Sequence, residues 1–119
     1  MEGGILVNCI FCKIISGEIP SLAVYEDDDL YAFRDIDPKA PTHILVIPKK
    51  HIASVNELDD ENVSIVSKAF LTLRKLAERE GIEESGYRIV VNTLKDGGQS
   101  VDHLHFHLLG GRRLSWPPG

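Results

Sequence analysis

Hydrophobic and polar positions alternate most regularly near the end of the chain, where residues 103–109 read His-Leu-His-Phe-His-Leu-Leu. Side chains of a β-strand point alternately to its two faces. This stretch therefore predicts a strand with His103, His105 and His107 on one face and the apolar residues between them on the other. A helix fits poorly, because at 3.6 residues per turn those apolar residues would share no side.

Four further strands are predicted from shorter apolar or alternating runs, at residues 22–25, 30–34, 42–48 and 87–92. The first two form a hairpin across the acidic turn at residues 26–29. The third is mostly apolar and β-branched, which predicts a strand buried on both faces. Together with the histidine-bearing strand, these runs predict an antiparallel sheet of five strands.

Two helices complete the predicted fold. A short helix is predicted at residues 9–15, and a long one starts at Asp59 or Asp60 and continues to about Glu80. The long helix should turn five apolar side chains toward the core and four charged side chains toward water. The apolar set is Val63, Val66, Phe70, Leu73 and Ala77, and the charged set is Lys68, Arg74, Lys75 and Glu78. The predicted fold class is α+β, with a helix backing the sheet.

Composition limits the classes of protein that the chain can belong to. Its 119 residues, 43% hydrophobic and 26% charged, are typical of one globular domain, with residues 1–8 as a loose arm. A net charge of −5 argues against a protein that coats nucleic acid, which needs a basic face. No apolar run approaches the roughly 20 residues of a membrane span, and the first four residues lack the features of a secretory signal. We therefore expect a cytoplasmic protein that binds neither nucleic acid nor membranes.

Three imidazoles on one strand face have three interpretations. They can be a tolerated cluster of half-exposed side chains, or metal ligands, or a catalytic group. Alternate residues of a strand lie about 6.5 to 7 Å apart, so one ion with bonds of about 2 Å cannot join all three. In the catalytic interpretation one imidazole attacks, a neighbour stabilises the developing charge, and backbone carbonyls fix the tautomers. The glycine-containing loop at residues 96–100 favours this interpretation, because its N–H groups can surround an anion beside the strand.

Several motifs along the chain resemble one family. The segment from His103 to Leu109 matches the signature of the histidine triad (HIT) superfamily of nucleotide hydrolases and transferases, and the rest of the chain from Cys9 onward is similar to its Hint branch, the histidine triad nucleotide-binding proteins. The similar stretches are residues 35–36, 41–43, 46–51, 86–88, 91–92, 97–101 and 109–112, with the Trp-Pro-Pro-Gly tail at residues 116–119. The resemblance implies a single HIT domain over residues 1–119. It also implies a two-fold homodimer whose sheets join into one of ten strands, with the tail at residues 112–119 near the partner's site.

The resemblance also implies a nucleotide site. The carboxylate of Asp35 would bind the ribose hydroxyls, and Trp116 in the tail belongs to the same implied site. Apolar side chains would form the wall of the base pocket, although ordinary core packing explains each of them equally well. These wall residues are Ile10, Phe11, Ile14, Phe33 and Ile36. The phosphate and the leaving group would be held by Asn92, Gly98, Gln99, Ser100, His105 and His107.

The reaction implied by the family is hydrolysis of a purine nucleoside phosphoramidate or acyl-nucleotide, with adenosine preferred. His105 would attack the α-phosphorus, His107 and Ser100 would assist, and His43 would buttress the triad. A nucleotidyl-histidine forms, and water then releases AMP or GMP, with no metal needed at the reaction centre. Three alternatives stay open: a dinucleoside polyphosphate hydrolase of the same superfamily, a nucleotidyl transferase, which typically has glutamine in place of His107, and a non-catalytic nucleotide-binding scaffold.

Cys9 and Cys12 form a Cys-x-x-Cys pair in a chain that we expect in a reducing compartment, so they are thiols or metal ligands rather than a disulfide. Microbial relatives with this opening imply a structural zinc site at Cys9, Cys12, His51 and His103. Two cysteines and two histidines are a chemically sound tetrahedral set for zinc. The alternative is a pair of cysteines packed in the core.

Overall fold

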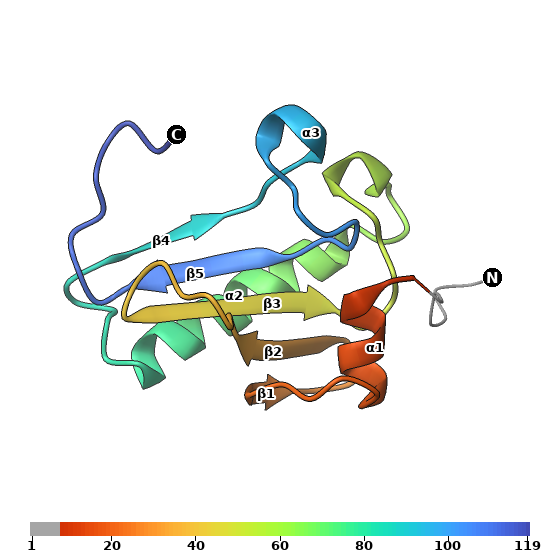
Figure 1. Ribbon diagram of the computed structural model, residues 1–119, viewed down its shortest axis with the longest axis horizontal. Coiled ribbons are helices and arrows are strands. Elements are labelled where there is room, and N and C mark those ends of the chain that lie inside the picture. Colours follow the sequence, from red (N-terminus) through yellow and green to blue (C-terminus); the bar gives the residue numbers. More distant parts are fainter. Residues whose placement is uncertain (1–7) are drawn as a thin grey trace.

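Five antiparallel strands form one sheet in the order β1-β2-β3-β5-β4 in the computed structural model, which describes residues 8–119 (Figure 1). The strands are β1 Ala23–Glu26, β2 Leu30–Arg34, β3 Thr42–Pro48, β4 Tyr87–Val90 and β5 Phe106–Gly110. The predicted α+β class and the five-stranded antiparallel sheet are confirmed. The loose arm predicted at residues 1–8 lies outside the described residues except for Asn8, which is in a turn.

The central strand β3 positions the rest of the fold. It pairs with β2 on one side and with β5 on the other, and all seven of its residues are buried, as the apolar run predicted. Burial on both faces arises because the sheet has a helix on each side, with α2 behind it and α1 in front of one end (Figure 1). The sheet therefore separates two apolar clusters, one packed with α2 and one packed with α1.

The long helix α2, Ser64–Arg79, differs from its prediction in its start and in its buried face. Asp59 caps the turn before the helix, where its carboxylate accepts the N–H groups of Glu61 and Asn62 at 2.9 and 3.0 Å. The predicted apolar face is partly wrong, because Val63 and Phe70 are exposed. The buried face consists of Ala69, Thr72, Leu73, Leu76 and Ala77. Small alanines let the helix lie close to the sheet, and the four predicted charged residues are all exposed.

The short helix α1, Ile10–Ser16, forms where it was predicted. Cys9 is its N-cap, and Gly17 ends it with a φ of 87°, a left-handed conformation that glycine adopts without strain. Phe11, Cys12 and Ile14 are the buried residues of the helix. They pack on side chains of β2 and β3, so this helix covers the front of the sheet near the end of β3.

Two short helical segments interrupt the loops beside β3 and β5. A 3-10 turn at Val55–Glu57 follows β3, and α3, Leu94–Gly97, follows β4. The predicted glycine loop at residues 96–100 therefore begins inside a helical turn, which Gly98 ends with a φ of 78°. Among the residues that the structure describes, the helices are too short or too polar to cross a membrane.

Candidate active site and metal-ligand cluster

The side chains of the three triad histidines lie on the face of the sheet that α1 covers. The side chains of the residues between them lie on the other face, in the apolar cluster packed with α2. Leu104, Phe106 and Leu108 are fully or almost fully buried in the cluster under α2. The predicted alternation is therefore confirmed, but the regular strand begins only at Phe106. Before that residue the backbone bonds to loops, since the Leu104 N–H donates to the Ile52 carbonyl at 2.6 Å instead of to a neighbouring strand.

His105 has its imidazole tautomer fixed by the backbone. Its Nδ1 lies 2.7 Å from the carbonyl oxygen of His103. A carbonyl can only accept, so Nδ1 carries the proton and Nε2 keeps its lone pair. Burial lowers the pKa of His105, and the hydrogen bond to His103 opposes this only in part. The neutral imidazole is therefore the form at neutral pH, with a nucleophilic nitrogen available at Nε2.

Hydrogen bonding to His43 fixes His107 in the tautomer opposite to that of His105. The backbone N–H of Lys39 donates to His43 Nδ1 at 3.0 Å, so the proton of the neutral His43 ring is on Nε2. That nitrogen lies 2.9 Å from His107 Nδ1 and donates to it. His107 must then carry its own proton on Nε2. Burial, reinforced by the neighbouring His105 and His43, lowers the pKa of His107 to about 4, and burial also lowers the pKa of His43.

His43 therefore supports His107 from behind. It is only 5% exposed, and Asp35 Oδ2 lies 3.5 Å from its Nε2. The other carboxylate oxygen of Asp35 accepts the N–H of Asp37 at 2.8 Å, which fixes the Asp35 side chain at the end of β2. His105, with a lone pair on Nε2, can attack a phosphorus. His107, with a proton on Nε2, can protonate a leaving group.

An apolar cavity of about 240 Å³ opens beside His105 and His107. It brings together nine of the residues predicted for the nucleotide site, with Leu45 and Val101 in addition. The predicted lining residues are Ile10, Phe11, Ile14, Phe33, Asp35, Ile36, Ser100, His105 and His107. Leu45 could have been found from the sequence, because it alternates with His43 on the same face of β3. Val101 follows Ser100 directly and carried no separate signal.

Four other predicted residues lie outside the lining of this cavity. The Gln99 side chain accepts the N–H of Leu94 and donates to the carbonyls of Ala53 and Val101, so its amide holds the loop together. Asn92 donates to the Gly97 carbonyl at 2.6 Å, and Gly98 ends α3. Trp116 is 80% exposed, with the Arg88 guanidinium 6.0 Å from its ring centre.

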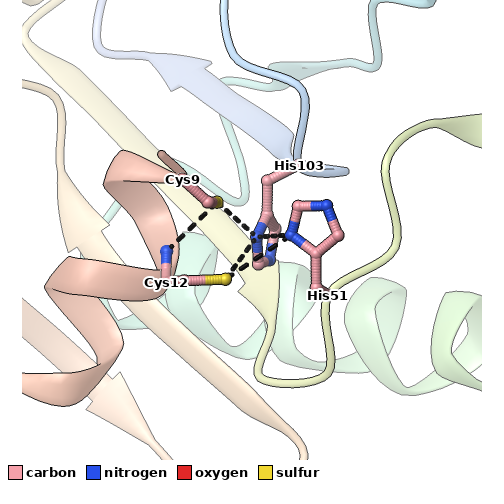
Figure 2. A group of neighbouring side chains, drawn as sticks. All are labelled: Cys9, Cys12, His51 and His103. Carbon is pink, nitrogen blue, oxygen red and sulfur yellow. Dashed lines mark hydrogen bonds between the residues drawn. The ribbon is translucent and has the colours of Figure 1, made fainter. Parts of the chain in front are cut away.

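Cys9, Cys12, His51 and His103 converge at the N-terminal end of α1 (Figure 2). His103 Nδ1 lies 3.3 Å from Cys9 Sγ, 3.7 Å from Cys12 Sγ and 3.2 Å from His51 Nδ1. Cys12 Sγ lies 3.5 Å from His51 Nδ1. Zinc bonds of about 2.0 Å to nitrogen and 2.3 Å to sulfur give tetrahedron edges of about 3.3 to 3.8 Å. These four of the six distances fit a tetrahedral metal ion, and all four ligand atoms lie within 4.8 Å of one another.

The two histidines of this cluster are neutral, which is the form that binds a metal. His103 Nε2 lies 2.8 Å from the Pro48 carbonyl and must donate to it, so Nδ1 presents its lone pair to the other three residues. Burial lowers the pKa of His103 to about 4 and lowers the pKa of His51, which keeps both rings neutral. The Cys12 N–H donates to Cys9 Sγ at 3.3 Å. The cluster can hold a divalent metal such as zinc.

The fold and the histidine site define an α+β domain built around two imidazoles of opposite tautomer. Residues 16–114 match the family model of the HIT domain, so the chain belongs to the HIT domain family. It is 53% identical over 105 residues to the purine nucleoside phosphoramidase of Escherichia coli, covering 88% of each chain. It is 56% identical over 112 residues to an uncharacterized HIT-like protein of Synechococcus elongatus, covering 94% of this chain and 97% of that protein.

Solved structures agree with the fold. A HIT family hydrolase from Legionella pneumophila superposes with a TM-score of 0.92 at 54% identity, covering 94% of this chain and all of the other. A histidine triad protein from Clostridium difficile superposes with a TM-score of 0.90 at 48% identity, covering 92% of this chain and 96% of the other. The predicted family is confirmed.

Proposed function

We propose that this chain hydrolyses purine nucleoside phosphoramidates or acyl-nucleotides and releases the nucleoside monophosphate. The observation that carries the proposal is the pair of opposite tautomers at His105 and His107, each fixed by the hydrogen bonds described above. The Escherichia coli relative, a purine nucleoside phosphoramidase, supports the same reaction.

In the first step His105 Nε2 attacks the α-phosphorus and the bond from phosphorus to the leaving nitrogen breaks. The electron pair of that bond goes to the amine, which takes the Nε2 proton of His107; the negative charge left on the His107 ring is balanced by the positive charge of the His105 ring, which now carries phosphorus on Nε2 and keeps its proton on Nδ1. Ser100, which lines the cavity, would bond the leaving nitrogen, and the loop N–H groups of residues 98–100 would stabilise the phosphoryl oxygens. His107 Nδ1 stays bonded to His43, which keeps the ring oriented.

In the second step water attacks the phosphorus of the nucleotidyl-histidine and the bond from phosphorus to His105 Nε2 breaks. The water gives one proton to His107 Nε2, which restores the starting tautomer, and the monophosphate leaves. The apolar side chains from α1 and β2 would hold the purine, and the Asp35 carboxylate would accept bonds from the two ribose hydroxyls. Adenosine is the expected nucleoside.

The decisive experiment compares substrates on the purified protein. Adenosine 5′-phosphoramidate should yield AMP, while a diadenosine polyphosphate should be cleaved slowly or not at all. Binding of AMP without turnover of any phosphoramidate or acyl-nucleotide would favour the non-catalytic scaffold. Rapid cleavage of the dinucleotide would favour the polyphosphate hydrolase.

We also propose that zinc occupies the cluster of Cys9, Cys12, His51 and His103 as a structural ion. The support is the tetrahedral spacing of the ligand atoms and the Nδ1 lone pair of His103. Elemental analysis of protein purified without added metal should give about one zinc per chain. A Cys12→Ser variant should lose most of it, and wild-type protein without zinc would contradict this assignment.

A further inference from the structure

Helix α1 contributes side chains to both the cavity beside the triad histidines and the metal-ligand cluster. Ile10, Phe11 and Ile14 line the cavity beside the catalytic histidines, while Cys9 and Cys12 belong to the metal-ligand cluster. A helix of seven residues is not stable alone, since nucleation outweighs the few hydrogen bonds that it forms. Its position therefore depends on what its two sets of side chains contact.

Phe11 connects the two sites directly. Its ring centre lies 5.9 Å from that of His103 and 5.1 Å from that of His105, both in edge-on geometry. The centre of the same ring lies 5.5 Å from that of Phe33, which also lines the cavity. A shift of α1 away from the sheet would thus change the shape of the base pocket and the packing of His105 together.

His103 is the second connection. Its imidazole is part of the metal-ligand cluster, and its backbone carbonyl accepts the Nδ1 proton of His105. The Pro48 carbonyl holds the far side of the imidazole at 2.8 Å. A ligand set that fixes the His103 ring therefore also fixes the group that determines the tautomer of the nucleophile.

We propose that metal binding and nucleotide binding are coupled through Phe11 and His103. A metal ion bound in the cluster keeps α1 against the sheet, which maintains the shape of the purine pocket and the position of the His105 imidazole. The inference rests on the function proposed above. Phe11 and His103 act here as positioning residues, and the ligands are a thiophilic divalent cation and a purine nucleoside monophosphate. Without the cation, α1 loses its four-ligand anchor to the loops that contain His51 and His103.

Coupling of this kind is reciprocal. If zinc tightens AMP binding by some factor, AMP must tighten zinc binding by the same factor. Typical couplings are about 5- to 150-fold. We expect removal of zinc to weaken AMP binding by at least about fivefold, and saturating AMP to lower the Kd for zinc to the same extent.

Calorimetry with AMP on zinc-loaded and zinc-stripped protein measures the first factor. Competition with a chromogenic chelator, in the presence and absence of AMP, measures the second. The second measurement starts from the intact, zinc-loaded protein, so it stays informative if the stripped protein unfolds. Neither measurement depends on turnover.

Two matched variants separate coupling from binding. Phe11→Leu keeps an apolar wall but loses the ring contacts to His103 and His105, so both ligands should still bind with a coupling near onefold to threefold. Phe33→Leu removes another ring from the same cavity. The described contacts of that ring are with Phe11 and Tyr31, and not with His103 or His105. That variant should weaken AMP binding but keep the wild-type coupling factor.

The possible failures are distinguishable. Equal AMP affinity with and without zinc overturns the coupling and leaves the proposed hydrolase intact. Full coupling in Phe11→Leu overturns the role of that ring. A protein that binds no zinc overturns the inference, and a protein that binds no AMP in either form overturns the proposed function along with it.

Discussion

His43 Nε2 lies 2.9 Å from His107 Nδ1, which joins a buried residue of β3 to a triad residue of β5. The two strands are neighbours, with His43 paired to Leu109 and His107 paired to Leu45. Because the Lys39 N–H occupies the other nitrogen of His43, the loop after β2 determines where the His107 proton is. A proton fixed on His107 Nε2 is what the departing amine needs.

We therefore expect His43→Ala to lower kcat by about tenfold or more while changing KM little. Without the donor, His107 can place its proton on either nitrogen, and only one of the two tautomers serves as a general acid. Steady-state kinetics measures the loss. The ¹⁵N shifts of His107 should change at the same time from one tautomer to a mixture.

His43→Gln is the control for that experiment. Its amide can still donate toward His107, so part of the activity and of the Nε2–H tautomer should return. A His43→Ala protein with normal kcat and an unchanged His107 spectrum would refute the positioning role.

Replacement of His105 by Asn should leave AMP binding within a few fold of wild type and reduce turnover by at least about a thousandfold. Asn keeps a side chain that can donate to the His103 carbonyl, but it has no nucleophilic nitrogen. Calorimetry with AMP and single-turnover assays test the two parts. A covalent nucleotide trapped on His103 or His107 in the wild-type protein would show that the nucleophile is misassigned.

Strand positions were predictable where a mostly apolar run is buried on both faces of the sheet. The runs at residues 30–34 and 42–48 became β2 and β3 without any change, because all of their residues except Arg34 are buried. The buried face of α2 was not predictable in the same way. Two alanines allow the helix to lie flat on the sheet, and Phe70 remains 45% exposed with its ring 5.9 Å from Phe106.

The site was predictable where side-chain chemistry carries it and less so where the backbone does. The grouping of Cys9, Cys12, His51 and His103 and the apolar lining of the cavity were predicted from residue type and from resemblance to the family. The Lys39 N–H and the Pro48 carbonyl set the tautomers of His43 and His103, yet any residue type provides such groups. Gln99, which was predicted to contact the phosphate through its backbone N–H, has its side chain bonded to Leu94 and Val101 of its own loop and to Ala53 of the loop after β3.

The edge strand β4 leads to a prediction about assembly. Tyr87–Val90 pairs only with β5 among the described strands, so its other edge has unpaired backbone groups. Two copies can satisfy them by pairing β4 with β4, which would join two sheets of five strands. Light scattering at micromolar concentration should therefore give twice the chain mass of 13.2 kDa. A monomer across that concentration range would exclude the joined sheet.

Protonation of His107 should leave activity unchanged from pH 8 down to about pH 5 and lower it below that. The pKa of His107 is lowered from 6.5 to about 4, chiefly by burial, so the neutral ring with its Nε2 proton persists well below the usual titration range of histidine. Protonation at Nδ1 would break the hydrogen bond from His43. A pH profile of kcat for a phosphoramidate measures the lower limb, and a midpoint near pH 6.5 would contradict the burial argument.

The same pKa shift predicts how stability depends on pH. Between pH 6.5 and about 4 the unfolded chain binds a proton at residue 107 that the folded chain does not, so the free energy of unfolding falls as the pH falls through this range. Above pH 6.5 the contribution of this group is constant. At about 1.4 kcal/mol per pH unit, the total contribution is about 3 kcal/mol.

Urea unfolding at several pH values should show a steeper loss of the free energy of unfolding in wild-type protein than in His107→Gln, which has no titrating group at this position. Equal slopes for the two proteins would show that His107 titrates alike in the folded and unfolded chains, and the neutral form assigned to it in the mechanism would lose its physical basis.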